Sequence, residues 1–475
     1  MNAARESATL LGGEANALAQ TVLSVVFEAA PRSAPLLRDR ILALTAAEEA
    51  TTPRYARLAA AAPSLHFMSI TLVEDALYDP VFVVELNFDG PPGPFFAELE
   101  AALGEALRDM LRCAKPPPAA GALFAAVTAP GSRVPVAPLL EASAVRPAVF
   151  HQGNRGLDRR RIEAEGALFA AARVLADAPA LRAMTILAIH EHLRATLAPD
   201  FPWLNARAPA RIGAAESLGD RIRLLAFALA AVIALAAPAA FFAVIPRVSL
   251  TGAPPLVWPT LVVGAMALSV TVGLLWLRAL EKAEPTQDEP SLDPALQAAM
   301  ARGEDRTVQN HMISIVHIKP GVLRAVLVRA GLWGLGLLLR ANGSARAGYL
   351  AGMRTIHFAH WALIGAGGRL MFHSNYDSSW ESYLDDFIEK AHAGLTLAWT
   401  NGVGFPRTRL LVGEGASRGR LFKAWARRSM TRSQFWFTAY KAWTVNQIER
   451  QARLADGLRR ASLTPSQADA WVLDL

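Results

Sequence analysis

The chain has 475 residues, of which 53% are hydrophobic and 19% charged, and its formal net charge is +7. This composition is too apolar for an ordinary soluble protein and too charged for a polytopic transporter, so it indicates soluble modules joined to a small membrane part. The single Cys113 excludes an intramolecular disulfide and a cysteine-based zinc or iron–sulfur site. Because no aromatic-basic nucleic-acid signature accompanies the positive charge, we expect a lipid membrane as partner and no nucleic acid.

The first third of the chain predicts a helical region followed by an α/β module. Residues 1–62 are rich in Ala and Leu and predict helices, whereas residues 64–175 alternate strand-like and helix-like stretches. The elements expected in this module are strands near 65–74, 81–88 and 146–152 and helices at 95–112 and 157–175. Residues 176–220 predict a helix and a Pro-rich approach to the membrane.

Two uncharged apolar stretches, residues 224–246 and 256–277, form the expected membrane segment. Each is long enough to cross the hydrocarbon core, which takes roughly 20 residues. Arginines flank the pair on both outer sides, whereas the connecting loop carries only Arg247. The positive-inside rule therefore predicts a two-span protein of the cell (inner) membrane with both large modules in the cytoplasm.

A polar linker is expected at residues 281–308, and an interfacial helix within residues 309–354. The apolar stretch 322–339 of that region carries Arg324 and Arg329, so it predicts a helix that lies in the interface or packs on the protein.

The second module is expected at residues 355–460, with a tail at 461–475. Its predicted elements are a hairpin of strands at 356–364 and 369–376, a helix beginning at Ser378 with Glu381 completing a capping box, strands at 395–399 and 434–440, a basic helix at 418–428 and a helix at 444–458.

The two modules repeat one pattern. The first module contains Leu65-His66-Phe67 and, after an apolar stretch, Asn87-Phe88-Asp89-Gly90. The second contains Ile356-His357-Phe358 and, at nearly the same spacing, Asn375-Tyr376-Asp377-Ser378. A third pair of matching segments is formed by residues 150–163 and 436–449. Each small sheet leaves one face uncovered by its own helices, and stacking the sheets buries both faces. The predicted fold is α+β: two ferredoxin-like modules paired as an intramolecular α/β barrel, with a two-helix transmembrane hairpin inserted between them.

The segment from His357 to Phe387 (HFAHWALI…FHSNYDSSWESYLDDF) resembles a family of uncharacterised bacterial membrane-associated proteins. The duplicated pattern is also similar to the dimeric α/β-barrel superfamily, which includes dye-decolourising peroxidases and chlorite dismutases. That resemblance implies either haem as a cofactor with a peroxidase-like activity or, as in other members of the superfamily, a haem-free enzyme or a binding module. The peroxidase GxxDG motif is matched only in part, because its first Gly is absent near Asp89 and Ser378 replaces its last Gly.

The candidate site residues divide by chemistry. Asp89 and Asp377 are candidate catalytic proton shuttles, or alternatively cap a helix or shape a turn. The candidate ligands of haem or another cofactor are His66, His357, His360 and His373, which alternatively are satisfied structural histidines. Arg420 and Arg427, on the basic helix, suit the carboxylates of haem or anionic headgroups, or form a solvated face. We predict no separate metal site.

Three function classes follow. The first is a haem-dependent, peroxidase-like oxidoreductase. The second is a non-catalytic membrane module that binds a lipid or small hydrophobic ligand between the sheets. The third is a scaffold for a protein partner.

Overall fold

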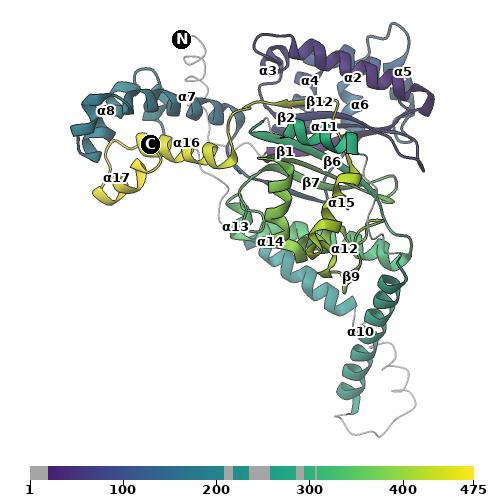
Figure 1. Ribbon diagram of the computed structural model, residues 1–475. Helices are drawn as coiled ribbons and strands as arrows, with labels where there is room; N and C mark the ends of the chain where they lie inside the picture. Colours follow the sequence, from purple (N-terminus) through teal and green to yellow (C-terminus); the bar gives the residue numbers. More distant parts are fainter. Residues whose placement is uncertain (1–19, 208–217, 235–256, 285–293, 305–306) are drawn as a thin grey trace.

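The computed structural model describes residues 20–207, 218–234, 257–284, 294–304 and 307–475. The fold is α+β and contains two five-stranded antiparallel sheets with helices outside them (Figure 1). The first sheet has the order β12-β2-β3-β1-β4, with β1 at Gln20–Glu28, β2 at Leu65–Val73, β3 at Val81–Asp89, β4 at Ala144–Val145 and β12 at Phe435–Thr438. The second has the order β11-β6-β8-β7-β5, with β5 at Val149–Gln152, β6 at Gln309–His317, β7 at Ile356–Ile364, β8 at Arg369–Asp377 and β11 at Met430–Thr431.

The two halves of the chain exchange strands. β5 belongs to the first half but pairs with β7, and β12 belongs to the second half but pairs with β2. The expectation that each of these strands stays in its own module is therefore wrong. β5 and β12 have four residues each, and a strand this short buries too little apolar surface to determine its own pairing partner. Each one pairs instead with the free edge of the opposite sheet.

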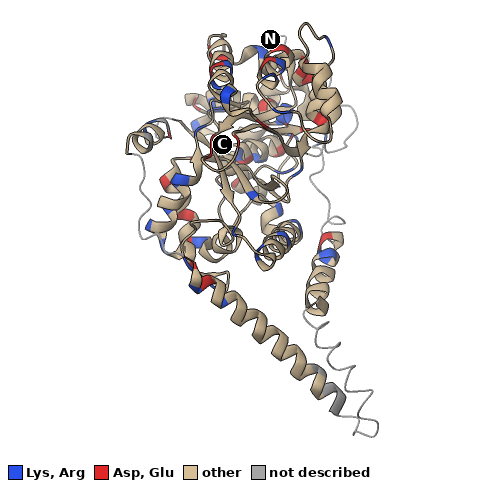
Figure 2. Cartoon of the chain, turned by 90° about the vertical axis from the view of Figure 1, so that its right-hand side faces the viewer, with Lys and Arg blue, Asp and Glu red and all other residues tan. Residues whose placement is uncertain are grey.

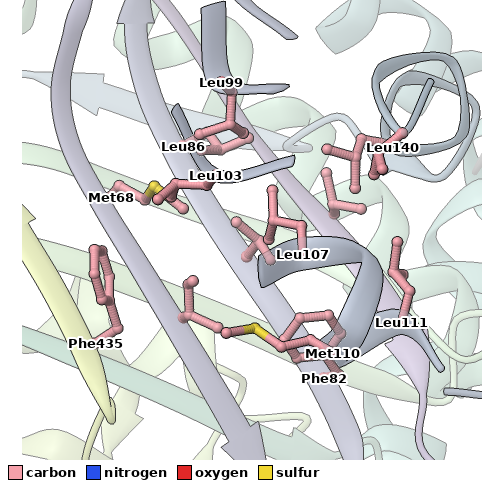
Figure 3. Close-up of a cluster of buried hydrophobic side chains, with 14 of the residues drawn as sticks. Met68, Phe82, Leu86, Leu99, Leu103, Leu107, Met110, Leu111, Leu140 and Phe435 are labelled. Atoms are coloured by element: carbon pink, nitrogen blue, oxygen red, sulfur yellow. The ribbon is translucent and has the colours of Figure 1, made fainter. Parts of the chain in front are cut away.

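Helices cover the outer face of each sheet. In the first half, Met68 and Leu86 of the sheet pack against Leu99, Leu103 and Leu107 of α4 (Figure 3). The helices of this half are α2 at Ala34–Glu49, α3 at Ala56–Ala61, α4 at Pro92–Leu111, α5 at Gly121–Thr128 and α6 at Ala137–Ala142. On the second sheet lie α12 at Val322–Ala341, α14 at Trp380–Trp399 and α15 at Gly419–Ser429, accompanied by the short α13 at Gly343–Arg346 and a two-stranded ribbon of β9 at Thr408–Arg409 and β10 at Gly413–Glu414.

A third helical cluster joins the halves. α7 at Arg159–Ala176 follows β5, α16 at Val445–Leu458 follows β12, and the two helices pack against each other. α8 at Ile186–Leu197 and α17 at Pro465–Val472 complete this cluster. The exchanged strands and the helices after them thus make the halves one folded body.

Several predicted elements need correction. β1 lies in the region predicted to be helical, and β6 lies in the region predicted to be interfacial. Both strands are rich in β-branched residues, which favour a pleated, half-buried surface. Residues 395–399, predicted as a strand, continue α14 beyond a kink at Ala391. The N-cap of α14 is Ser379 rather than Ser378, and the predicted linker contains α11 at Pro294–Glu304.

Two helices are long and apolar enough to cross a membrane by length and composition, Val263–Ala283 and Val322–Ala341. The first forms most of α10 at Val257–Ala283, which coincides with the second predicted span and projects from the body with its charged residues at the body end (Figure 2). Residues 218–234 are helical and contain the start of the first predicted span, whereas residues 235–246 lie outside the described residues.

Strand exchange constrains the topology. β5 precedes the membrane segment and β6 follows it, yet both belong to one hydrogen-bonded sheet. A sheet cannot be divided by a bilayer, because lipid offers no partners for exposed backbone groups. The chain between Gln152 and Gln309 must therefore cross a membrane an even number of times.

Candidate metal centre

The inner faces of the two sheets meet in a layer that is apolar at both ends and polar in the middle. Val83 and Met371 belong to the apolar cluster at one end, and Phe67 and Phe358 to the cluster at the other. Because alternate residues of a strand face the same side, the positions between these ends also face the opposite sheet. They carry Ser24, Ser69, Glu85, Asn87, His311, His360, His373 and Asn375.

Glu85 of β3 is the centre of this polar layer and is fully buried. Its Oε1 accepts hydrogen bonds from the side-chain amides of Asn87 and Asn375, each at 2.8 Å. Its Oε2 accepts one from the Ser69 hydroxyl at 3.0 Å and lies 2.9 Å from Nε2 of His311 and 3.7 Å from Nδ1 of His373. Both halves of the chain therefore supply partners to one carboxylate.

His373 and His360 lie opposite each other in the pairing of β7 with β8. Their rings stack, with centroids 4.8 Å apart and an angle of 12° between the planes. Nε2 of His360 is 3.0 Å from the Ser24 hydroxyl, but its Nδ1 and both ring nitrogens of His373 have no hydrogen-bond partner among the described residues. Completely buried polar atoms are rarely left unpaired, so His373 needs an explanation.

Burial and charge determine the protonation states in the cluster. Burial by itself would raise the pKa of Glu85, but attraction to His311 and His373 outweighs it and holds that pKa well below its usual range. Burial lowers the pKa of His373 well below the usual value and that of His360 to about 4. Burial therefore favours the neutral form of these two imidazoles, whereas the hydrogen-bonded contact with His311 favours the ionised carboxylate.

No Lys or Arg within the described ranges forms an ion pair with Glu85. One ligand atom from each of Glu85, His311 and His373 can be chosen so that all three lie within 4.8 Å of one another. Two imidazoles and one carboxylate form a donor set that divalent transition metals favour. The second nitrogen of His311 lies 3.1 Å from the Ser433 hydroxyl, the kind of outer contact that orients a ligating imidazole.

The predicted candidates His66, Asp89, His357 and Asp377 form two equivalent pairs outside this cluster. Nε2 of His66 lies 2.9 Å from Oδ1 of Asp89, and Nε2 of His357 lies 2.8 Å from Oδ1 of Asp377. Each histidine occupies an irregularity in the strand register, a position where a bulge re-aims a side chain.

The second oxygen of each aspartate is also used. Asp89 accepts a hydrogen bond from the backbone N–H of Arg159, and Asp377 accepts one from that of Val445, both at 2.8 Å. These donors begin α7 and α16, the helices that follow the exchanged strands. Asp89 and Asp377 therefore fasten the first turns of α7 and α16 to the sheets, which agrees with the alternative of a helix cap, and the proton-shuttle role stays a prediction.

The predicted haem ligands do not form one binding face. His360 and His373 are covered by the first sheet, whereas Arg427 lies on the opposite side of the second sheet. There Arg427 makes a two-pronged ion pair with Glu304, at 2.6 and 2.7 Å, and stacks over Trp380. Arg420 is exposed on the same helix. The arrangement does not fit a haem, because its proposed iron ligands and carboxylate partners lie on different faces of a sheet.

A small cavity lies between the second sheet and its helices. Trp361, Phe372, Trp399, Phe422 and Trp425 are among its mainly apolar lining residues. Its volume is about 30 Å³, which suits one water-sized group, whereas pockets for drug-sized ligands are about 300 Å³ or larger. The cavity therefore gives no support to a lipid bound inside the body.

The sequence analysis missed Glu85 and His311. Glu85 is the only charged residue in the apolar run 81–88, and such a position within a buried strand is a usable signal. His311 was missed because β6 itself was not recognised as a strand.

Comparison of the chain with protein-family models, with curated proteins and with solved structures gave no match. The functional conclusion therefore rests on the geometry of the polar layer.

Proposed function

We propose that this protein is a membrane-held metalloprotein, with a mononuclear centre formed by Glu85, His311 and His373. The observation that carries the proposal is the convergence of a fully buried carboxylate with two imidazoles, one of which has no other partner. The ligands come from β3, β6 and β8, so the site exists only when the two sheets are together.

Electrostatics support a cation at this position. An ionised carboxylate removed from water costs several kcal/mol unless an opposite charge compensates it. Glu85 has amide and hydroxyl donors, but among the described residues only imidazoles are available to balance its charge. A divalent ion supplies the missing charge, and it requires a neutral imidazole at His373, which burial already favours.

The number of ligands indicates the class of chemistry. Three protein ligands leave coordination positions for water or a small molecule, and the two-His-one-carboxylate set is typical of non-haem iron oxygenases. When bound, such a metal supplies Lewis-acid or redox chemistry. The chain keeps bulk water out, holds Glu85 ionised and orients the imidazoles. We therefore propose an oxidoreductase that uses a non-haem metal, in place of the haem peroxidase suggested by the sequence.

Two features of the architecture belong to this proposal. The strand orders β2-β3-β1-β4 and β7-β8-β6-β11 support two ferredoxin-like modules, and the contacts between inner faces support their pairing as an α/β barrel. The even number of membrane crossings, together with the arginines flanking the membrane segment, supports a body held at the cytoplasmic face of the inner membrane.

The direct test is metal titration of detergent-purified, chelator-treated protein with Fe²⁺, Mn²⁺, Co²⁺ and Zn²⁺, followed by calorimetry and metal analysis. We expect one ion per chain. Changing Glu85 to Gln, or His311 or His373 to Ala, should weaken binding at least 100-fold, because each variant removes one of three ligands.

His190→Gln is the matched control, since His190 is fully buried in another cluster, where its Nε2 contacts the Gly457 carbonyl, its one hydrogen-bond partner in the described part of the chain. It should bind metal like the unaltered protein. Binding that is weak, non-stoichiometric or equal in the Glu85→Gln variant would show that the cluster is a closed Glu–His hydrogen-bond network without a metal.

A further inference from the structure

We infer that α12 lies flat in the membrane interface and binds anionic phospholipid, although it is long and apolar enough to cross the bilayer. This inference does not depend on the metal centre. It rests on the connectivity of the second sheet, on the exposed face of α12 and on the contacts that α12 makes with the membrane segment.

The connectivity excludes a crossing. α12 connects β6 to β7, and both of these strands pair with β8 in one sheet. If α12 crossed, β6 and β7 would lie on opposite sides of the bilayer. The residues between α12 and β7 contain only the short α13 and cannot provide a return crossing, which requires a helix of roughly 20 residues.

One face of α12 is already used by the protein. Arg324, Val328, Leu332 and Gly336 are buried on that face, and the Arg324 guanidinium forms an ion pair with Glu284, just beyond the end of α10. A helix that crossed a bilayer would carry these contacts into the hydrocarbon region. The buried face therefore fixes α12 to the surface of the body, beside the end from which α10 projects (Figure 1).

The opposite face is an exposed stripe at helical spacing. Val322 is 78% exposed, Val326 56% and Trp333 55%, and Arg329 lies among them and is also exposed. Contiguous apolar side chains are seldom left in water on a soluble surface. Valine and tryptophan beside an arginine suit the boundary between acyl chains and anionic headgroups.

Contacts with residues 218–234 show which surface this stripe adjoins. The ring of Trp333 packs edge-on against Phe227 with centroids 4.8 Å apart, and Arg340 lies 3.4 Å from Asp220. A Cβ at Gly334 would come within 2.7 Å of the Phe227 ring, so the absence of a side chain allows this close approach. Phe227 lies within the first predicted span, so the stripe begins where the chain enters the membrane.

Depth measurement tests the inference on the full chain. With Cys113, which is buried, replaced by Ala, single cysteines are introduced at Val326, at Leu268 of α10 and at Val174 of α7, all of which are exposed. Each is spin-labelled in nanodiscs holding one protein in mixed phosphatidylcholine and phosphatidylglycerol. Collision with oxygen and with a water-soluble nickel chelate then gives the depth of the label.

We expect the label at 326 to lie about 5–10 Å below the headgroups, the label at 268 to lie deep in the hydrocarbon and the label at 174 to remain in water. A label at 326 as deep as that at 268 would overturn the inference in favour of a third span. The inference would also be overturned if the label at 326 were as accessible to the water-soluble nickel chelate as the label at 174. The same holds if a second protein copy shielded the label at 326 from both collision partners.

The anionic lipid is tested separately. In neutral nanodiscs, or after Arg329→Gln in mixed ones, the label at 326 should move toward water, while the label at 268 remains unchanged. An unchanged position of the label at 326 in both experiments would contradict a role for anionic headgroups.

Discussion

The two sheets carry the same strand order, yet their inner faces differ at a few positions. The strand registers align Glu85 of the first sheet with His373 of the second, and likewise Ser69 with His360. They also align Val22 with His311. The histidines of the polar layer therefore lie on one sheet and the carboxylate on the other.

Other positions are the same in both halves. His66 and Asp89 have direct counterparts in His357 and Asp377, with the same bulge, the same ring nitrogen bonded and the same backbone contact to the first turn of a helix. Features that occur twice fasten the exchanged strands, which both halves require. Features that occur once form the candidate metal centre, which needs complementary ligands.

The largest effect should come from breaking the repeated pairs. Asp89→Ala and Asp377→Ala each remove a buried hydrogen-bonded carboxylate and should lower the free energy of unfolding by about 3–5 kcal/mol. Because the pairs are equivalent, denaturant titration should give similar losses for both variants. Metal affinity of the molecules that remain folded should stay unchanged; a selective loss of metal binding would assign the aspartates to the centre instead.

The second effect is a loss of stability in acid that comes from a buried histidine of the second sheet. The pKa of His360 falls from 6.5 to about 4 on folding, so the unfolded chain takes up a proton first as the pH decreases. Stability should be full above pH 6.5 and decline toward pH 4, by roughly 3 kcal/mol from His360 alone. His360→Gln should flatten this profile between those values, as measured by denaturant midpoints, whereas an unaltered slope would contradict a neutral buried His360.

The smallest effect concerns a single hydroxyl. Ser24→Ala removes the only hydrogen bond found for His360 within the described residues and should cost about 1 kcal/mol. Ser143→Ala is the matched control, because the buried Ser143 hydroxyl has no hydrogen-bond partner among the described residues. Its removal should leave the thermal unfolding temperature nearly unchanged. Equal losses in the two variants would show that the Ser24 contact contributes nothing specific.

Part of this structure could be predicted from the sequence. The hairpins of β2–β3 and β7–β8 are recognisable as pairs of apolar stretches, and the equal placement of His66–Asp89 and His357–Asp377 revealed the duplication. Strand exchange could not be predicted, because β5 and β12 are short and their partners are determined by free sheet edges distant in sequence. Only half of the polar layer could be predicted from the sequence. His360 and His373 share a hairpin, whereas Glu85 and His311 become neighbours only when the two sheets stack.

The most direct test of the account is X-ray absorption at the K edge of the metal in protein loaded with one equivalent of Fe²⁺ or Zn²⁺. The account predicts two imidazole nitrogens and a carboxylate oxygen at about 2.0–2.2 Å, and loss of one imidazole contribution in the His373→Ala variant. A spectrum of water oxygens alone, or one unchanged by His373→Ala, would show that the metal does not bind between the sheets.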